Sequence, residues 1–429
     1  MKSVFQKEDV GKLIRSGKFD HFVRPDYDGR SVANLAPTIA HLLNTNFEGT
    51  ELKRNLLAEV EEEIGHVILF IVDAFGYNLL FRTKGVRAAL DLVFPRGRAK
   101  RTFITSVFPS TTSAALTSIS TGLTPSEHGM LGYTLFLKEL GSVVNMITLS
   151  PVNEKEKSRI FDLGLTPERL LPHVKLTEAL EQSGIPTRFL IRFELKGSGL
   201  STLLYKRSEA IPYLSLSDMF LSLSKILHER KGGLTIVYWD GLDAMQHHYG
   251  PFSKETNFEL FTFLNSMREF FRNVKRNSVD GVFFMLSSDH GQAETKDELA
   301  FKAEDIKLFK ESLAIPPTGE GRCAYMHLKR DAKRFNRKFE EKLGKHFCLL
   351  ETGKSALSGL FGKPAVPREY MDRLGDFISI ARGASKLVFT YDVRERHEPP
   401  FVRYGSHGGL TINEMVVPLI TSPLRALVR

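Results

Sequence analysis

The chain has 429 residues, of which 42% are hydrophobic and 25% are charged, as in an ordinary folded protein. No run reaches the ~18 apolar residues of a membrane helix, and residues 1–20 lack the apolar segment of a secretory signal. We therefore expect no membrane association. The net charge of +9 suits an anionic substrate, but it also suits a merely basic surface.

At this length we expect one large α/β domain with an insertion, or two domains. The only two cysteines, Cys323 and Cys348, are far apart in the sequence and form no CxxC pair. Because disulfides are rare in reducing compartments, two isolated thiols favour a cytoplasmic protein without disulfide bonds.

Short apolar runs alternate with helical stretches along the chain. Val67–Val72 predicts a buried strand, and residues 102–108 predict another that ends at Pro109. The small residues of STTSAALTSISTG suit a tightly packed helix that ends at Gly122. Further short apolar runs follow at residues 143–149, 187–193, 234–239 and 282–288, and residues 257–276 have helical spacing.

This alternation predicts an α/β fold with a mostly parallel central sheet flanked by helices. In such sheets the functional site forms at the carboxyl ends of the strands. Residues 294–398 are charge-rich, and residues 329–342 predict a basic helix. We interpret 294–398 as an inserted cap that selects the substrate, and residues 1–293 with 399–429 as the catalytic core.

Asp73 follows the first apolar strand, and Thr111 and Thr112 begin the helix of small residues. A hydroxyl at a helix N-terminus lies beside free backbone N–H groups, which favour a phosphate or an alkoxide. Taken one at a time, these residues are more often simple caps and turn residues.

Three further motifs combine Asp and His. Asp243 and His247 are four residues apart, so both can face one ion from one turn of a helix or from a tight loop just after residues 234–239. Asp289 and His290 are adjacent at the end of the apolar run 282–288, and His407 precedes two glycines. Independent caps and turns would not be expected to supply such a balanced set of metal ligands beside a hydroxyl. The set therefore favours a two-metal phosphoryl-transfer site.

The chain resembles the alkaline phosphatase superfamily, in its type I phosphodiesterase/nucleotide pyrophosphatase branch. The resemblance rests on four motifs that occur in the order of the family. They are TGLTPSEHG (residues 121–129), Asp-x3-His-x2-Gly-Pro (243–251), SDHG (288–291) and HGG (407–409). It implies an alkaline-phosphatase-like fold and a nucleophilic threonine, which aligns with Thr112 and not with Thr111.

The resemblance also implies two divalent metal ions, with zinc as the expected ion and manganese or another ion as an alternative. One ion would be held by Asp73, Asp289, His290 and the oxygen of Thr112. The other would be held by Asp243, His247 and His407. Thr112 would attack phosphorus and form a phospho-threonine, which water would then hydrolyse.

One position departs from the family. Nucleotide pyrophosphatases carry an Asn that binds a phosphoryl oxygen, and here the aligned residue is Tyr133. Tyr133 could donate an O–H in its place. Arg322 is a second candidate for a substrate contact, because arginine pairs well with phosphate, although a surface charge is as good an interpretation.

The first functional prediction is a metal-dependent phosphodiesterase or pyrophosphatase that acts on a small phosphate ester, which could be a nucleotide. A phosphomonoesterase or phosphonate hydrolase on the same site is the alternative. A more distant alternative is a nucleic-acid-binding protein that uses the basic segment Lys329–Lys342. No binding module supports it, and a charged helix is usually a solvated face. The oligomeric state stays open.

Overall fold

The computed structural model describes residues 22–60, 62–391 and 403–428. The predicted lack of a signal segment concerns residues 1–20, and the second predicted core–cap boundary falls at residue 398. Both predictions concern residues outside the described part of the chain. Among the described residues, no helix is long and apolar enough to cross a membrane.

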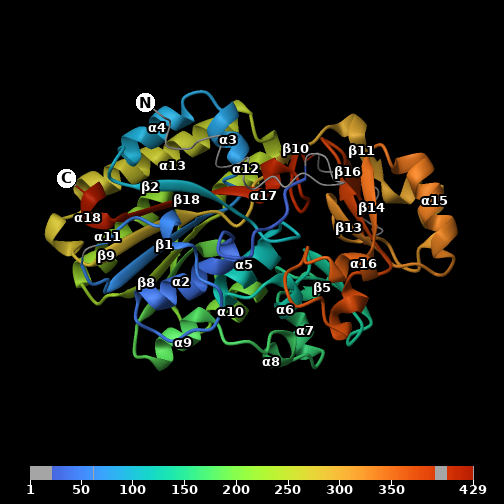
Figure 1. Ribbon diagram of the computed structural model, residues 1–429, viewed down its shortest axis with the longest axis horizontal. Helices are drawn as coiled ribbons and strands as arrows, with labels where there is room; N and C mark the ends of the chain where they lie inside the picture. Colours follow the sequence, from blue (N-terminus) through green and yellow to red (C-terminus); the bar gives the residue numbers. More distant parts are fainter. Residues whose placement is uncertain (1–21, 61, 392–402, 429) are drawn as a thin grey trace.

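A seven-stranded central sheet forms the middle layer of the larger part of the molecule (Figure 1). In spatial order its strands are β2 (Lys100–Thr105), β18 (Val416–Pro423), β9 (Val282–Ser287), β1 (His66–Val72), β8 (Gly233–Trp239), β6 (Thr187–Arg192) and β7 (Glu209–Tyr213). The strands β9, β1, β8, β6 and β7 pair in parallel, whereas β18 is antiparallel to both of its neighbours. The mostly parallel sheet predicted from the sequence is confirmed.

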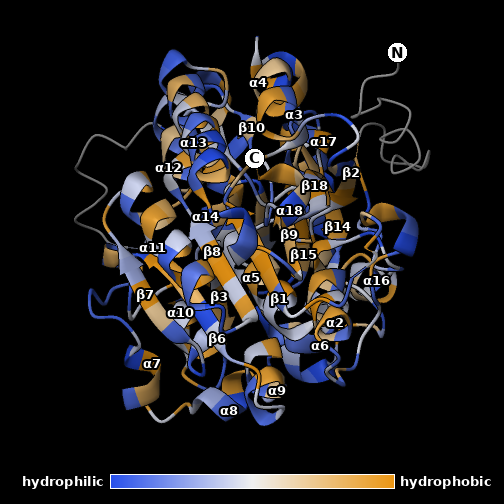
Figure 2. Ribbon diagram, turned by 90° about the vertical axis from the view of Figure 1, so that its left-hand side faces the viewer, coloured by the Kyte–Doolittle hydropathy of each residue, from blue (hydrophilic) through white to orange (hydrophobic). Residues whose placement is uncertain are grey.

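Helices cover both faces of this sheet (Figure 1). One layer contains α3 (Tyr77–Arg82), α4 (Val86–Val93), α11 (Leu216–Glu229), α12 (Gly241–Tyr249) and α13 (Lys254–Asn273). The other contains α2 (Leu35–Leu42), α5 (Thr112–Thr121), α9 (Leu176–Gln182) and α10 (Gly199–Tyr205). Every residue of β1, β8 and β9 is buried, and Figure 2 shows these strands as the apolar centre. Burial on two faces explains why they are continuous apolar runs.

A second seven-stranded sheet is antiparallel throughout its described pairings. Its order is β14 (Phe347–Glu351), β15 (Phe377–Ala381), β13 (Cys323–Met326), β12 (Thr318–Glu320), β3 (Thr134–Leu137), β4 (Ser142–Asn145) and β5 (Ser150–Pro151). The apolar run 143–149 therefore contributes to this sheet and not to the central one. The predicted cap shares this sheet with residues 134–151 of the predicted core, and the division between cap and core stays a prediction.

The predicted cap also has a small apolar cluster of its own. Phe335, Phe339 and Leu343 are buried on one face of α15 (Ala332–Leu343), because residues four apart lie on the same side of a helix. They belong to a cluster with Phe309 of α14 (Lys307–Ser312) and Phe377 of β15. The charged residues of α15 occupy its other face, as in an ordinary amphipathic helix. Both cysteines are free and buried.

Shorter elements connect these parts. They are α6 (Pro125–His128), α7 (Arg159–Asp162), α8 (Pro167–Leu170), α16 (Thr352–Leu357), α17 (Ile412–Met415), α18 (Leu424–Leu427), β10 (Ala293–Glu294), β11 (Ala300–Lys302), β16 (Lys386–Val388) and β17 (Gly405–Ser406).

Candidate metal centre

Three neighbouring strands of the central sheet end at one edge, and each brings a carboxylate there. Asp73 directly follows β1, which lies between β8 and β9. Asp289 lies just beyond the end of β9, and Asp243 lies just beyond β8. Of the two placements that the sequence allowed, a helical turn or a tight loop, the structure has the first: Asp243 lies in the first turn of α12, which begins only two residues after the strand. The parallel strands therefore make these carboxylates converge.

Thr112 is the first residue of α5, and Thr111 is its N-cap. The Thr111 side chain is fully buried, and its hydroxyl makes no hydrogen bond among the described residues. The Thr112 side chain is partly exposed, and its Oγ1 lies 3.0 Å from Nε2 of His290. Of the two hydroxyls, only that of Thr112 makes a described contact with a predicted ligand.

The first group of candidate ligands is Asp73, Asp289 and His290, whose ligand atoms lie within 4.8 Å of one another. Nε2 of His290 is 3.5 Å from Oδ1 of Asp73 and 3.5 Å from Oδ2 of Asp289. These two carboxylate oxygens are buried and accept no hydrogen bond from the described residues. Buried carboxylate oxygens without partners are costly unless a cation binds them. This group therefore fits a metal ion.

The second group gathers around Asp243. Its Oδ2 is 3.4 Å from Nε2 of His247, and its Oδ1 is 3.9 Å from Nε2 of His407. Ligand atoms of Asp243, His290 and His407 also lie within 4.8 Å of one another. The rings of His290 and His407 stack with centroids 3.9 Å apart, so His290 lies where the two groups meet. The structure thus brings all seven predicted residues into one cluster.

The three histidines turn the same ring nitrogen, Nδ1, toward the backbone. In each ring Nδ1 lies near a backbone carbonyl oxygen, at 3.1 Å in His290, 2.9 Å in His247 and 3.3 Å in His407. A carbonyl oxygen can only accept, so Nδ1 carries the proton in the neutral ring. In its neutral form each ring keeps the lone pair of Nε2 toward the carboxylates, and this is the form that binds a metal.

The charges in the cluster perturb one another. Burial raises the pKa of Asp73 well above its usual value, and the carboxylates of Asp289 and Asp243 raise it further. Burial alone would raise the pKa of Asp243, but three nearby histidines lower it. Burial alone would lower the pKa of His407, whereas the neighbouring carboxylates, first Glu320, raise it to about 9. A divalent cation would offset the repulsion between these buried carboxylates.

Two further residues that the sequence analysis did not single out contact the clustered carboxylates. The Tyr238 hydroxyl, next to last in β8, donates to Oδ2 of Asp73. The Gln292 amide donates to Oδ1 of Asp243. Only the position of Gln292, two residues after His290, could have pointed to it. Tyr238 is brought to Asp73 by the pairing of β1 with β8, which a motif does not encode.

The two predicted substrate contacts are placed differently. Tyr133 is partly exposed, and its hydroxyl accepts a hydrogen bond from Asn145, so its own proton remains available to a ligand. Arg322 is fully buried, and its guanidinium forms a bidentate ion pair with Glu414 and donates to two backbone carbonyls. A substrate contact from Arg322 is therefore wrong in this structure, because its charge is neutralised inside the protein.

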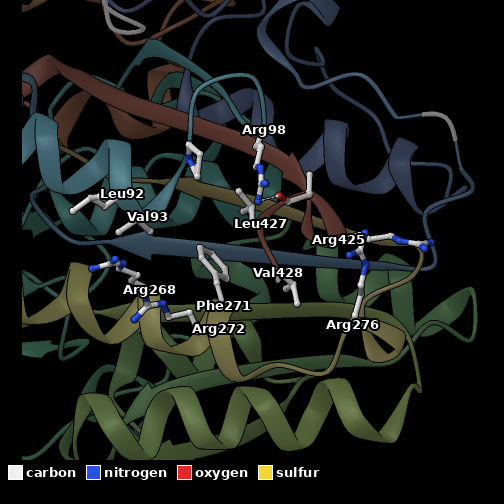
Figure 3. Close-up of a pocket in the computed structure, with 12 residues that line it drawn as sticks. Leu92, Val93, Arg98, Arg268, Phe271, Arg272, Arg276, Arg425, Leu427 and Val428 are labelled. Atoms are coloured by element: carbon white, nitrogen blue, oxygen red, sulfur yellow. Dashed lines mark hydrogen bonds between the residues drawn. The ribbon is translucent and has the colours of Figure 1, made fainter.

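A cavity of about 540 Å³ lies away from this cluster (Figure 3). Its lining combines apolar side chains, such as Val93 and Phe271, with five arginines: Arg98, Arg268, Arg272, Arg276 and Arg425. Arg268 and Arg272 lie in the last turns of α13, which precedes β9. The cavity is thus near the amino end of that strand, opposite the end that leads to Asp289. None of the seven clustered residues lines it.

The chain matches the family model of type I phosphodiesterase / nucleotide pyrophosphatase over residues 67–399. It matches no curated protein sequence. Solved structures resemble its fold at low identity. Murine ectonucleotide pyrophosphatase/phosphodiesterase 5 is 14% identical with a TM-score of 0.57, over 83% of this chain and 87% of that one. Phosphonoacetate hydrolase from Sinorhizobium meliloti is 18% identical with a TM-score of 0.59, over 84% and 94%.

The matched residues 67–399 include six of the seven clustered side chains, from Asp73 to His290, and His407 follows shortly after them. The solved structures support the alkaline-phosphatase-like fold that the sequence predicted. The family consists of phosphoric ester hydrolases and is typically dependent on divalent metals, which agrees with the candidate ligand groups. The chain is therefore a member of the type I phosphodiesterase/nucleotide pyrophosphatase family within the alkaline phosphatase superfamily.

Proposed function

We propose that the protein hydrolyses phosphate esters with Thr112 as the nucleophile and with two divalent metal ions. The observation that carries the proposal is the position of Thr112 Oγ1, which lies at the N-terminus of α5 and 3.0 Å from Nε2 of His290. A hydroxyl there has candidate metal ligands on one side and the backbone N–H groups of a helix on the other.

Asp73, Asp289, His290 and Thr112 would hold one ion, and Asp243, His247 and His407 would hold the other. Their mixture of carboxylate oxygens and imidazole nitrogens suits zinc, with manganese as the alternative. When bound, such ions neutralise charge on the phosphoryl oxygens and on the attacking and leaving oxygens. The Nδ1 contacts of the histidines keep Nε2 available for this role.

The reaction would proceed in two displacements. Thr112 Oγ1 forms a bond to phosphorus while the bond from phosphorus to the leaving oxygen breaks. This gives a phospho-threonine and releases an alcohol or a phosphate compound. Water then attacks the same phosphorus, and Thr112 recovers its hydroxyl as the second product leaves. The first turn of α5, which has no side-chain cap, would bind non-bridging oxygens through its N–H groups.

The family favours a phosphodiester or a nucleotide-type diphosphate as the substrate. One similar structure, the inactive murine enzyme at 13% identity and a TM-score of 0.56, is a complex with AMP, which makes a nucleotide a reasonable first candidate. Phosphonate hydrolysis is the second candidate. It is favoured by the replacement of the expected Asn by Tyr133 and by the likeness in fold to phosphonoacetate hydrolase.

Comparing three substrates on the zinc-loaded and manganese-loaded protein tests this proposal. We expect metal-dependent cleavage of bis-p-nitrophenyl phosphate to exceed that of p-nitrophenyl phosphate, and phosphonoacetate to release little phosphate. Faster cleavage of the monoester would indicate that the protein is a phosphomonoesterase. Release of phosphate mainly from phosphonoacetate would select the second candidate.

A further inference from the structure

Glu320 enters the metal cluster from the second sheet. It is the last residue of β12, and its side chain is 10% exposed. Its Oε2 lies 3.2 Å from Nδ1 of His407. Its Oε1 is buried and has no hydrogen-bond partner among the described residues. A buried carboxylate with one oxygen on a candidate ligand and the other unpaired is costly, unless the charge serves the site.

The loop that carries His407 is shaped to admit this carboxylate. Gly408 has φ +110, a conformation that side-chain-bearing residues rarely adopt. A Cβ at Gly408 would lie 3.1 Å from Cδ and 3.1 Å from Oε2 of Glu320. Glycine therefore removes both a steric and a conformational obstacle to the close approach.

A second contact holds the same loop from the same segment of the cap. Arg322, two residues after Glu320, forms the bidentate ion pair with Glu414. Oε1 of Glu414 in turn accepts the N–H of Gly409 at 2.8 Å. The segment Glu320–Arg322 thus contacts the loop near His407 and again through Glu414, which fixes the backbone on both sides of Gly408.

We propose that Glu320 is a positioning residue that orients the His407 ring and strengthens Nε2 as a ligand of the second metal ion. This inference deepens the proposed function and rests on its two-ion site. A carboxylate that accepts the Nδ1 proton fixes the tautomer and increases the basicity of Nε2. The Ser110 carbonyl oxygen, 3.3 Å from Nδ1, can fix the tautomer as well, so the particular contribution of Glu320 is its negative charge.

The variants Glu320→Gln and Glu320→Ala separate charge from shape. The Gln side chain keeps the size of Glu and a carbonyl oxygen near Nδ1 but removes the charge, whereas Ala removes all three. Glu341→Gln is the matched control, because Glu341 is an exposed residue of α15 in the cap. Thermal unfolding of the metal-free proteins would confirm that each variant is folded.

Zinc binding at equilibrium, measured in competition with a chelating dye, tests the role without any assay of activity. We expect two ions in the wild-type protein and in Glu341→Gln. In Glu320→Gln the second ion, which His407 would hold, should bind about 10- to 100-fold less tightly, while the affinity for the first ion is unchanged. In Glu320→Ala the affinity for the second ion should fall by at least as much.

Two unfavourable results can be told apart. If wild-type protein binds two ions and Glu320→Gln binds both with unchanged affinity, the role of Glu320 is wrong and the two-ion site stands. If wild-type protein binds no second ion, the proposed two-ion site fails, and the role of Glu320 fails with it.

Discussion

Thr111 and Thr112 are adjacent in the sequence, but their hydroxyl groups have different surroundings. The Thr112 Oγ1 lies beside His290, whereas the Thr111 side chain is fully buried. Thr112→Ala should lower kcat by on the order of 10³-fold or more, because the nucleophile is lost. Bound metal, counted by atomic emission, should stay close to the wild-type content. Substantial turnover by Thr112→Ala would remove it as the nucleophile.

Thr111→Val is the matched control for that variant. Valine keeps the branched shape of threonine, and the Thr111 hydroxyl makes no hydrogen bond to the part of the chain that the structure describes. We therefore expect kcat within a few-fold of the wild-type value. Equal losses in both variants would mean that the N-terminus of α5, and not the Thr112 hydroxyl, was disturbed.

His247 and His248 form a second natural pair. Nε2 of His247 faces Asp243 at 3.4 Å, while the neighbouring His248 is exposed. His247→Ala should lower the occupancy of one ion and leave the other bound, and His248→Ala should leave both. Metal counting after equilibrium dialysis checks this. Unchanged occupancy in His247→Ala would contradict the assignment of this ligand.

The seven residues that the sequence singled out lie together in the structure, and four of them come from two compact motifs. Asp243 with His247, and Asp289 with His290, are neighbours in sequence as well as in space. The sequence could not predict Tyr238 or Glu320, since each reaches the site through strand pairing or through a contact between distant segments. The substrate contact predicted for Arg322 was wrong for a related reason, because its buried partner, Glu414, lies far along the chain.

At the scale of elements, α5 and α6 show why the motif TGLTPSEHG is part of the site without supplying a ligand. Gly122 ends α5 with φ +70, a left-handed conformation that suits glycine. His128, the last residue of α6, hydrogen bonds with Nε2 to Ser118 of α5 and accepts the N–H of Met130 at Nδ1. These contacts hold the helix that begins at Thr112.

His128 should make the protein less stable in acid. Its pKa is lowered to about 3, chiefly by burial and then by His173 and Arg373. Between pH 6.5 and about 3 the unfolded chain therefore binds a proton that folded His128 rejects. The free energy of unfolding is therefore unaffected by this proton above pH 6.5. Below pH 6.5 it decreases as the pH falls, by up to ~1.4 kcal/mol per pH unit.

Urea unfolding from pH 5 to pH 7.5 measures this dependence. His128→Gln should lower the free energy of unfolding at pH 7.5 by ~1–3 kcal/mol through its lost hydrogen bonds. It should also depend less steeply on pH than the wild type. His228→Gln, at an exposed position of α11, should match the wild type. An unchanged slope in His128→Gln would contradict a neutral, buried His128.

The elements that the sequence predicted best are the fully buried strands. β1, β8 and β9 are continuous apolar runs. Their short lengths favour buried strands over buried helices. The run 143–149 looked similar but pairs in the second sheet, because apolar content does not specify which sheet a strand joins. The sequence left open whether Asp243 lies in a helix or in a loop, because helix N-termini are poorly defined by sequence.

For the whole molecule, the shared second sheet is the feature that apolar periodicity could not reveal. Strands β12 to β15 of the predicted cap continue the sheet of β3 to β5, although almost 170 residues separate β5 from β12. A cytoplasmic location and the core–cap division stay predictions. Glu320 of the predicted cap nonetheless contacts His407 of the candidate ligand cluster, so we expect the predicted cap and core to unfold together.

Phe339→Ala tests that expectation. Phe339 is fully buried between α15 and the second sheet, so its truncation should lower the free energy of unfolding by ~3–5 kcal/mol. Calorimetry should show one transition at a lower temperature. Leu357→Ala, at a position of α16 that is 76% exposed, should change the free energy by less than ~0.5 kcal/mol. A separate early transition in Phe339→Ala would show that the cap unfolds independently.

The central claim is that metal ions and the Thr112 hydroxyl act together on a phosphate ester. The most direct test measures hydrolysis of bis-p-nitrophenyl phosphate by chelator-treated protein, before and after zinc or manganese is restored, in wild type and in Thr112→Ala. We predict that only the metal-restored wild type is active, while the restored variant binds metal and does not turn over. Activity that survives chelation, or metal-restored activity that is equal in both proteins, would contradict the account.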